Sequence, residues 1–360
     1  MNILIILLSL NLEGFYEYQG QLLKNGDDFS YTGYNKINLT LKEKISSAYF
    51  RVDLDYTSYH GKTLFDLRNF IPESVSFPIQ YAYSSNLHFR NAFLRLRAGK
   101  LTIQMGRQQI GWGTGYAYNP TNVFQRKSIL DPSYELDGVD AIRMFFDLTD
   151  NISFDALFLP DQKIDSSSYG LRVKSSFPLI DVSLGYLSYE KSFVNAFLTL
   201  ARMRSYNITM DFSTDILGMG FHGEGIYDYK NHKLTGIMGM DYTLGDGITS
   251  LLIEYLYNEN GKSSGNYSLQ DWLGYLMGVE VSMARDEVFV NLERTFELLK
   301  VRLSCVYNIG DRSALIIPGV VYSFNDYTEV TITGYQGTGC NGTQYADMGS
   351  GLMFRIRTWF

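Results

Sequence analysis

The amino-acid sequence predicts an all-β fold, a transmembrane antiparallel up-and-down β-barrel of about 18 strands, with about 16 strands as the alternative. Apolar and polar side chains alternate in segments of about ten residues, which is the two-residue period of a strand. Turn residues separate these segments, and short connections occur alongside long polar ones. The chain contains 28 Tyr, 23 Phe and 33 Gly but only 7 Pro, a composition that favours strands over helices.

The N-terminal residues carry an apolar run, Ile3–Leu10, that is too short for a membrane-spanning helix of about 20 residues. No basic residue precedes the run and no small-residue cleavage site follows it, as a complete secretory signal would require. Residues 1–11 are therefore either a signal-peptide remnant or the start of the first strand. No linker-like stretch interrupts the rest, so residues 12–360 are expected to form one barrel domain.

The alternation is clear in the segment 48–56. Phe50, Val52 and Leu54 fall on one face, whereas Arg51, Asp53 and Asp55 fall on the other. The same pattern recurs at 169–174 and 301–307, where Arg172, Lys174 and Arg302 oppose apolar rows. One face therefore suits lipid and the other suits water.

Following this pattern along the chain places the strand starts near Leu12, Gly33, Ser47, Leu87, Lys100, Asp137, Asn151, Ser168, Ile180, Arg204, Ile216, Lys233, Ile248, Glu287, Leu299, Ala314, Tyr327 and Ala346. Gly, Asn and Asp occupy the short connections, for example 99–100 and 325–326, because they tolerate the backbone angles of hairpin turns. Longer polar stretches occupy roughly 59–86, 111–136, 258–286 and 336–345. Short periplasmic turns and long extracellular loops are typical of membrane barrels.

Several classes of function are excluded or disfavoured by composition. The net charge of −7 argues against nucleic acid as a partner, because phosphates attract a basic face. Cys305 and Cys340 lack the Cys-x-x-Cys spacing of a zinc or redox site and are expected to be free, and neither a metal nor a cofactor is predicted. The four histidines, at positions 60, 88, 222 and 232, lie in no recognisable catalytic motif, so no enzyme is predicted.

The last segment, 352–360, ends in an aromatic residue after alternating apolar positions. It resembles the C-terminal signal of bacterial outer-membrane proteins, in which the terminal Phe and the preceding apolar residues are read by the barrel assembly machinery. The matching positions are Leu352, Phe354, Ile356 and Phe360, whereas Thr358 departs from the pattern. The resemblance implies an integral protein of the outer membrane in a Gram-negative-type envelope, in contact with outer-membrane lipids.

The most distinctive local motif is Gly-Arg-Gln at 106–108, followed by Trp-Gly at 112–113 and Asn-Pro at 119–120. This run resembles one found in large bacterial porin-like families, including alginate-export-type porins, although those relatives often carry Asp where this chain has Asn122. A loop of this size is long enough to fold into the lumen, with Asn119 setting a turn. The resemblance implies a constriction near Arg107 and Trp112; the alternative is that both residues only pin the strand end and loop.

Ionised side chains are expected on the lumen side, because facing lipid at mid-bilayer costs about 2–4 kcal/mol for Arg or Lys. The candidate pore residues are Arg107, Trp112, Asn119, Arg51, Asp53, Asp55, Arg172, Lys174, Glu224, Asp241, Glu254 and Arg302. Both charge signs are present, so the sequence sets neither the ion selectivity nor the oligomeric state.

The predicted function is a channel for passive diffusion of small hydrophilic solutes or ions, with a charged lumen narrowed by an inward-folded loop. A barrel of about 16 to 18 strands is wide enough for an aqueous path. The alternative is a surface-binding or polysaccharide export or assembly barrel with a blocked lumen, for which the long loops would supply the binding surface.

Overall fold

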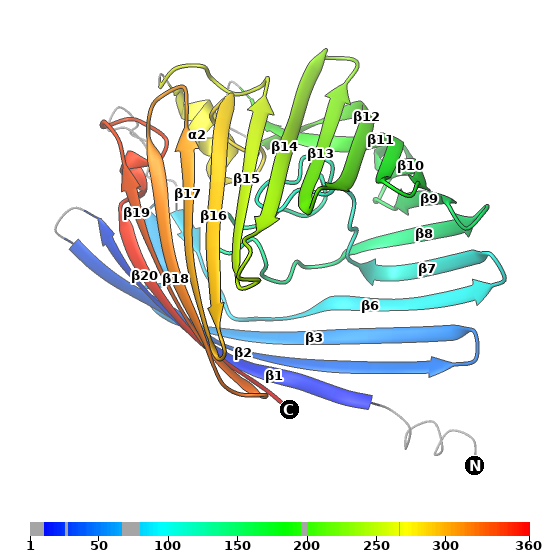
Figure 1. Ribbon diagram of the computed structural model, residues 1–360, viewed down its shortest axis with the longest axis horizontal. Coiled ribbons are helices and arrows are strands. Elements are labelled where there is room, and N and C mark those ends of the chain that lie inside the picture. The colour runs from blue at the N-terminus through cyan, green and yellow to red at the C-terminus, as the bar shows by residue number, and fades with distance from the viewer. Residues whose placement is uncertain (1–10, 26–27, 67–79, 196–199, 266) are drawn as a thin grey trace.

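The computed structural model describes residues 11–25, 28–66, 80–195, 200–265 and 267–360; the predicted signal-peptide remnant lies almost wholly outside them. Eighteen antiparallel strands form one closed sheet (Figure 1). The first and last strands close the sheet into a barrel, because β1 pairs with both β2 and β20. The predicted 18-stranded barrel is confirmed, and 16 strands are excluded.

The barrel strands are β1 (Asn11–Asn25), β2 (Asp28–Ile45), β3 (Ala48–Gly61), β6 (Asn86–Ala98), β7 (Leu101–Gln108), β8 (Val139–Asp147), β9 (Ile152–Leu159), β10 (Ser168–Ser176), β11 (Ile180–Val194), β12 (Leu200–Ile216), β13 (Met219–Asp228), β14 (Lys233–Thr243), β15 (Thr249–Asn258), β16 (Asp286–Phe296), β17 (Leu299–Asn308), β18 (Ala314–Asn325), β19 (Thr328–Thr338) and β20 (Ser350–Trp359). A separate hairpin, β4 (Leu64–Asp66) with β5 (Gln80–Ala82), lies within the connection between β3 and β6. The helix α2 (Leu269–Leu276) lies between β15 and β16.

Side chains alternate between the two faces of each strand. On β17, Val301, Leu303 and Tyr307 are exposed on the outer face, whereas Ser304 and Val306 on the opposite face are buried. Exposed apolar side chains continue on neighbouring strands, for example Leu292 on β16 and Ile316 on β18. An outer face of this kind suits lipid, since a closed sheet leaves no unpaired backbone edge.

The connections differ in length at the two ends of the barrel. Tight turns join β2 to β3, β6 to β7, β12 to β13 and β16 to β17 at one end. The long connections 62–85, 109–138 and 259–285 leave from the other end, which also carries shorter connections, such as 229–232 between β13 and β14 and 309–313 between β17 and β18. Among the described residues no helix is long and apolar enough to span a bilayer.

The interior is packed against the connection between β7 and β8. We call residues 109–138 the inner loop; it lies within the ring of strands (Figure 1). Ala117 and Tyr118 of this loop form one buried cluster with Ile237, Leu256 and Phe289 of the wall. Ile110 and Trp112 form a second cluster with Ala141, Leu157 and Leu187. The loop is therefore packed against the barrel wall through two apolar clusters.

Candidate functional site

The inner loop is held by carboxylates that project from the barrel wall. Glu224 on β13 accepts hydrogen bonds from the backbone N–H groups of Thr114 at 2.5 Å, Gly115 at 3.1 Å and Thr121 at 3.2 Å. The Glu224 side chain is buried, and its three hydrogen bonds to the loop are buried or partly buried. One wall side chain thus accepts from three backbone N–H groups and fixes Thr114–Gly115 and Thr121 of the loop together.

Glu254 on β15 repeats this arrangement one hairpin further along. It accepts from the backbone N–H of Tyr116, from Ala117 at 2.7 Å and from Tyr118 at 3.4 Å. His222 on β13 lies 2.8 Å from the same carboxylate through Nε2. Six loop N–H groups are thus satisfied by two buried wall residues, which replaces the water that an isolated loop would need.

Gly113 allows the loop to approach Glu224 closely. Its φ is +89°, in the left-handed region that glycine adopts without strain. A Cβ atom at this position would lie 2.0 Å from Oε2 of Glu224 and 2.3 Å from Oδ1 of Asn119. Sterics therefore require glycine at position 113, which accounts for the Gly of the Trp-Gly pair in the sequence motif.

Trp112 anchors the start of the loop. Its indole Nε1 donates to Asp155 on β9 at 2.7 Å, and Arg143 on β8 pairs with the same carboxylate at 2.5 Å. The guanidinium of Arg172 lies 6.0 Å from the centre of the Trp112 ring. The residue is fully buried, so its contacts fix the loop to the wall.

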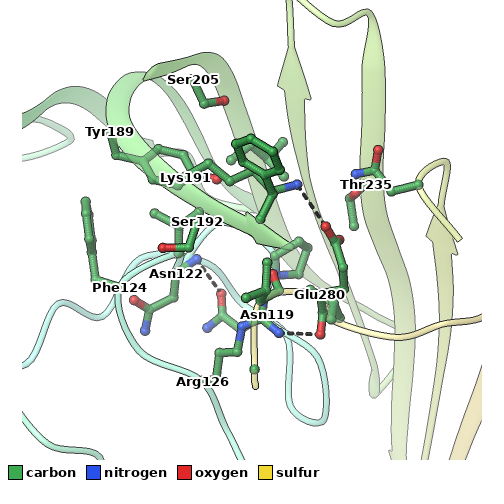
Figure 2. Close-up of a pocket in the computed structure, with 18 of the residues that line it drawn as sticks. Asn119, Asn122, Phe124, Arg126, Tyr189, Lys191, Ser192, Ser205, Thr235 and Glu280 are labelled. Atoms are coloured by element: carbon green, nitrogen blue, oxygen red, sulfur yellow. Dashed lines mark hydrogen bonds and ion pairs between the residues drawn. The ribbon is translucent and has the colours of Figure 1, made fainter. Parts of the chain in front are cut away.

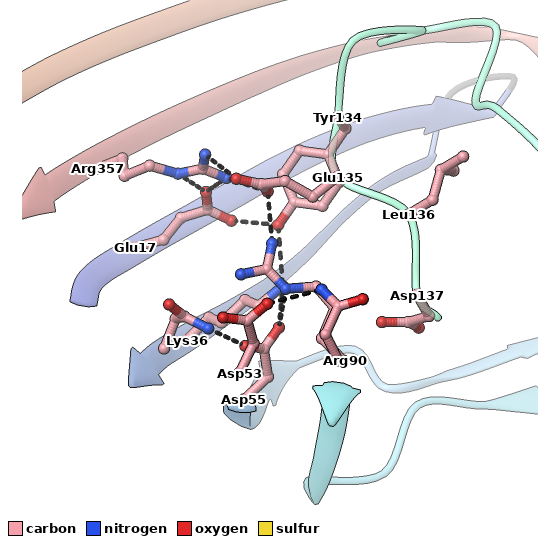
Figure 3. A network of polar contacts seen from close by, with 12 residues as sticks. Glu17, Lys36, Asp53, Asp55, Arg90, Tyr134, Glu135, Leu136, Asp137 and Arg357 are labelled. Atoms are coloured by element: carbon pink, nitrogen blue, oxygen red, sulfur yellow. Dashed lines mark hydrogen bonds and ion pairs between the residues drawn. The ribbon is translucent and has the colours of Figure 1, made fainter. Parts of the chain in front are cut away.

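The far end of the loop contacts the opposite wall, where the first and last strands meet (Figure 3). Tyr134 donates to Glu17 on β1 at 2.8 Å, and Glu135 pairs with Arg357 on β20 at 2.8 Å. Asp131 pairs with Arg355 on β20 at 2.8 Å. The loop therefore crosses the lumen from β7 to β13–β16 and on to β20 and β1.

Two charged groups of the loop are perturbed by this environment. Burial raises the pKa of the Asp131 carboxyl, but Arg355 and a hydrogen bond from Ser133 lower it by more, so the pKa lies below its usual value. Burial lowers the pKa of Lys127, against the opposing effect of Glu254 and Glu224. Lys127 donates to the carbonyls of Gly115 at 2.7 Å and Tyr116 at 3.2 Å, so it also stiffens the loop.

The loop separates two cavities. The outer cavity, on the long-loop side, has a volume of about 1300 Å³ and is lined by loop residues 117–129 and by the ends of β9 to β15. The inner cavity, of about 440 Å³, is lined by Arg51, Arg90, Arg95, Asn91 and Gln104, with Glu13 and Glu135 among the remaining residues. Charged groups of both signs therefore line both cavities, and those of the inner cavity are three arginines and two glutamates.

The remaining predicted pore residues lie in several places. Asp53 is buried and accepts from Thr40 and Asn91, with Arg51 2.9 Å away. Asp55 pairs with Lys36 at 2.9 Å and with Arg90 at 3.5 Å (Figure 3). The other placements are Arg172 with Asp211 at 2.7 Å, Lys174 with Asp181 at 3.7 Å, Asp241 3.9 Å from His222, and Asn119 in the outer cavity.

Two of the predicted pore residues stand apart. Arg107 is on the same side of β7 as the exposed Met105 and pairs with Asp140 at 2.7 Å, so the structure does not bring it to the loop contacts described above. Arg302 lines the wall of β17, and its buried Nε has no hydrogen-bond partner in the described part of the chain. The C-terminal residues Leu352, Phe354 and Ile356 share the side of β20 opposite Met353 and Arg355, and Phe360 is exposed.

Comparison with solved structures gives the fold. A mutant of the Rh. blastica porin aligns with a TM-score of 0.52 and 12% identity, covering 98% of this chain and 100% of that one. A triple mutant of the Rhodopseudomonas blastica porin aligns with a TM-score of 0.51 at the same identity and coverage. The chain has the fold of a bacterial porin. No protein-family model and no curated protein sequence matches it.

Several residues that hold the loop of this porin-like barrel were not predicted as site residues. Glu17, Asp131 and Glu287 belong to this group; Glu287 on β16 accepts from the hydroxyls of Tyr118 at 2.9 Å and Tyr345 at 2.8 Å. Strand parity carries a signal for two of them, because Glu17 follows the inward-facing Phe15 by two positions and Glu287 precedes the buried Phe289 by two. No sequence pattern marks Asp131, whose partner lies 224 positions away in the chain.

Proposed function

We propose that this porin-like barrel is an integral outer-membrane channel through which small hydrophilic solutes diffuse passively, along a charged lumen narrowed by the inner loop. The observation that carries the proposal is that Glu224 and Glu254 accept hydrogen bonds from six backbone N–H groups of that loop. Such anchors favour a fixed constriction rather than a loop that moves freely. No enzymatic role is proposed.

The character of the wall supports an aqueous path. Arg143, Arg172 and Lys36 each lie beside a carboxylate on the lumen side, with the charged atoms 2.5–2.9 Å apart. Charges of this kind belong in water or in ion pairs, since a lipid-facing Arg costs about 2–4 kcal/mol at mid-bilayer. A barrel of 18 strands has room for both the loop and water.

A blocked lumen is the second candidate, because the inner loop contacts strands on several sides of the barrel. Its partners lie on β1, β9, β13, β15, β16 and β20. Contacts this extensive would suit a plug. A barrel closed in this way would act at the cell surface, in binding or in polysaccharide export and assembly, and would not conduct at rest.

Single-channel conductance of the refolded barrel in planar bilayers tests both candidates. The wild-type protein is compared with the double variant Glu224→Gln, Glu254→Gln, in which neutral amides replace both anchors. We expect stepwise openings from the wild type and a noisier, larger conductance from the double variant, because each Gln amide keeps only one acceptor oxygen where both oxygens of the Glu accept from the loop. The matched control is Asp181→Asn, a carboxylate paired with Lys174 that has no described contact with the loop.

Folding of each variant is verified by circular dichroism and by heat-modifiable mobility in gels. A folded wild-type barrel that stays silent while the double variant opens would favour the blocked barrel. Silence from both proteins would contradict a channel altogether.

A further inference from the structure

The outer cavity has features of a binding site as well as of a vestibule. Its volume of about 1300 Å³ exceeds the roughly 300–1,000 Å³ of typical ligand pockets. It is closed on one side by the inner loop and on the other by the segment that follows α2 (Figure 2). A solute that enters from the long-loop side meets this cavity before the constriction.

Charges in this cavity are already compensated by protein groups. Lys191 pairs with Glu280 at 3.3 Å, and Arg202 pairs with Asp161 at 3.4 Å. Arg126 donates to the backbone carbonyls of Val279 and Glu280. Lys127 likewise donates to two loop carbonyls. Ion pairs or hydrogen bonds within the protein also engage the remaining charged residues of the cavity, which are Glu190, Asp228, Lys233 and Glu287. An ionic solute would have to compete with these contacts, whereas a neutral solute would not.

Asn122 offers polar atoms that the protein leaves unused. Its side chain is only 4% exposed, yet Oδ1 has no hydrogen-bond partner in the described part of the chain. The backbone N–H of Asn122 donates to Oδ1 of Asn119 at 3.2 Å, which fixes the position of the residue on the cavity wall. A buried amide without a partner is costly, so a ligand hydroxyl that pairs with it would gain affinity.

Two aromatic rings line the same cavity as this amide. Phe124 and Tyr189 both line the cavity, with ring centroids 6.1 Å apart and planes at 71° (Figure 2). Ser192 of β11 lines the same cavity and carries a hydroxyl group. Rings next to amide and hydroxyl groups suit a ligand with one apolar C–H face and a rim of hydroxyls.

We propose that the outer cavity binds neutral, hydroxyl-rich solutes of the sugar class through the Asn122 amide and the rings of Phe124 and Tyr189. The inference deepens the proposed channel function and rests on it, since the bound sugar would be the solute that the channel admits.

Isothermal titration calorimetry on the refolded, full-length barrel in detergent tests the inference. The probes are maltotriose, which is neutral, and trigalacturonate, which has a similar size but carries three carboxylates. We expect maltotriose to bind the wild type and to bind Asn122→Ala and Phe124→Ala at least tenfold more weakly. Truncation of Asn122 removes no described side-chain hydrogen bond within the protein, so loss of folding is not the expected cause. Asn151→Ala, at an exposed turn on the opposite end of the barrel, is the matched control and should bind as the wild type does.

Tighter binding of trigalacturonate than of maltotriose would overturn the inference, as would equal maltotriose affinity in the wild type and Asn122→Ala. Absence of maltotriose binding to the wild type would also overturn it. Conductance recorded without sugar tests the channel independently. A barrel that conducts without binding maltotriose would refute only this inference, whereas one that binds maltotriose without conducting would refute the channel.

Discussion

Arg95 differs from the other charged side chains that line the inner cavity. Arg51 pairs with Asp53, Arg90 with Asp55, and the two glutamates of the cavity also have basic partners. Arg95 instead donates to the neutral amide oxygen of Gln104 at 2.7 Å, and in the described part of the chain no carboxylate pairs with it. Its charge is therefore left to attract mobile anions from the lumen.

We expect Arg95→Ala to shift the reversal potential of the channel towards cation selectivity, because one uncompensated positive charge leaves the inner cavity. The measurement is the reversal potential in a tenfold KCl gradient. Arg97→Ala removes the same charge near the end of β6, outside the lining of the inner cavity, and should shift the potential by less than half as much. Equal shifts from the two variants would attribute selectivity to net charge rather than to the inner cavity.

Strand parity predicted that Glu224 and Glu254 face the lumen, but not what they contact. Glu224 and Glu254 were predicted as lumen charges, and the structure gives both the same kind of partner, the backbone of the inner loop. Those partners lie more than 100 positions away in the chain and carry no side-chain signature. A backbone N–H group is present at almost every residue, so the sequence cannot mark which ones a carboxylate will hold.

The strands were predicted more completely than any other part of the chain. Each predicted start corresponds to one observed strand. The largest offsets occur at β2, which begins at Asp28 rather than Gly33, at β12, which begins at Leu200 rather than Arg204, and at β20, which begins at Ser350 rather than Ala346. Strands β2 and β12 are long and extend to the loop side of the barrel. Beyond the bilayer a strand no longer needs an apolar lipid face, so the alternation that reveals it fades while its pairing continues.

The connections were predicted less well than the strands. The stretch at 258–286 was predicted only as a loop, although it contains α2. The side chain of Ser268 accepts from the N–H of Asp271, and the Asp271 carboxylate accepts from the N–H of Ser268, which is a capping box. This signal is visible in the sequence. The path of the inner loop is not, because it depends on contacts with distant strands rather than on a repeating pattern.

The ion pair of Asp131 with Arg355 makes the docking of the inner loop sensitive to acid. Although burial raises the pKa of Asp131, Arg355 and the hydrogen bond from Ser133 together lower it by more, so the pKa of the docked carboxyl lies below its usual value of 3.8. The pair therefore stabilises the docked loop fully above that value, and the stabilisation is lost as the pH falls through the lowered pKa. Open-channel current noise should rise below about pH 4.

Asp131→Asn provides the comparison, because it removes the titrating group and keeps the side-chain shape. We expect this variant to be noisier than the wild type at pH 7 and to change less on acidification; the neighbouring carboxylates Glu17 and Glu135 retain part of the response. Asp150→Asn, at the exposed turn between β8 and β9, should behave as the wild type. A variant as quiet as the wild type at pH 7 would show that the ion pair does not hold the loop.

Closure joins the two ends of the chain into one sheet. Strands β1 and β20 pair from Phe15 opposite Trp359 to Lys24 opposite Ser350. Beyond this ladder, Gly14 and Phe360 exchange two backbone hydrogen bonds, each of 3.0 Å. Gly14 leaves space for the approach, since a Cβ there would lie 2.3 Å from the carbonyl oxygen of Asn38 and 3.0 Å from the Phe360 ring.

The backbone of Phe360 contributes to closure, whereas its ring was predicted from the sequence to be read by assembly machinery, and variants can test the two roles separately. Deletion of Phe360 removes both backbone bonds, each worth about 0.5–1.5 kcal/mol, whereas Phe360→Ala keeps them. We expect the deletion to refold less completely in detergent than Phe360→Ala, measured by heat-modifiable mobility. In cells, both changes should lower the amount of barrel in the outer membrane if the ring is the signal. Equal refolding of the two variants would remove the closure role, and normal cellular levels of Phe360→Ala would remove the recognition role.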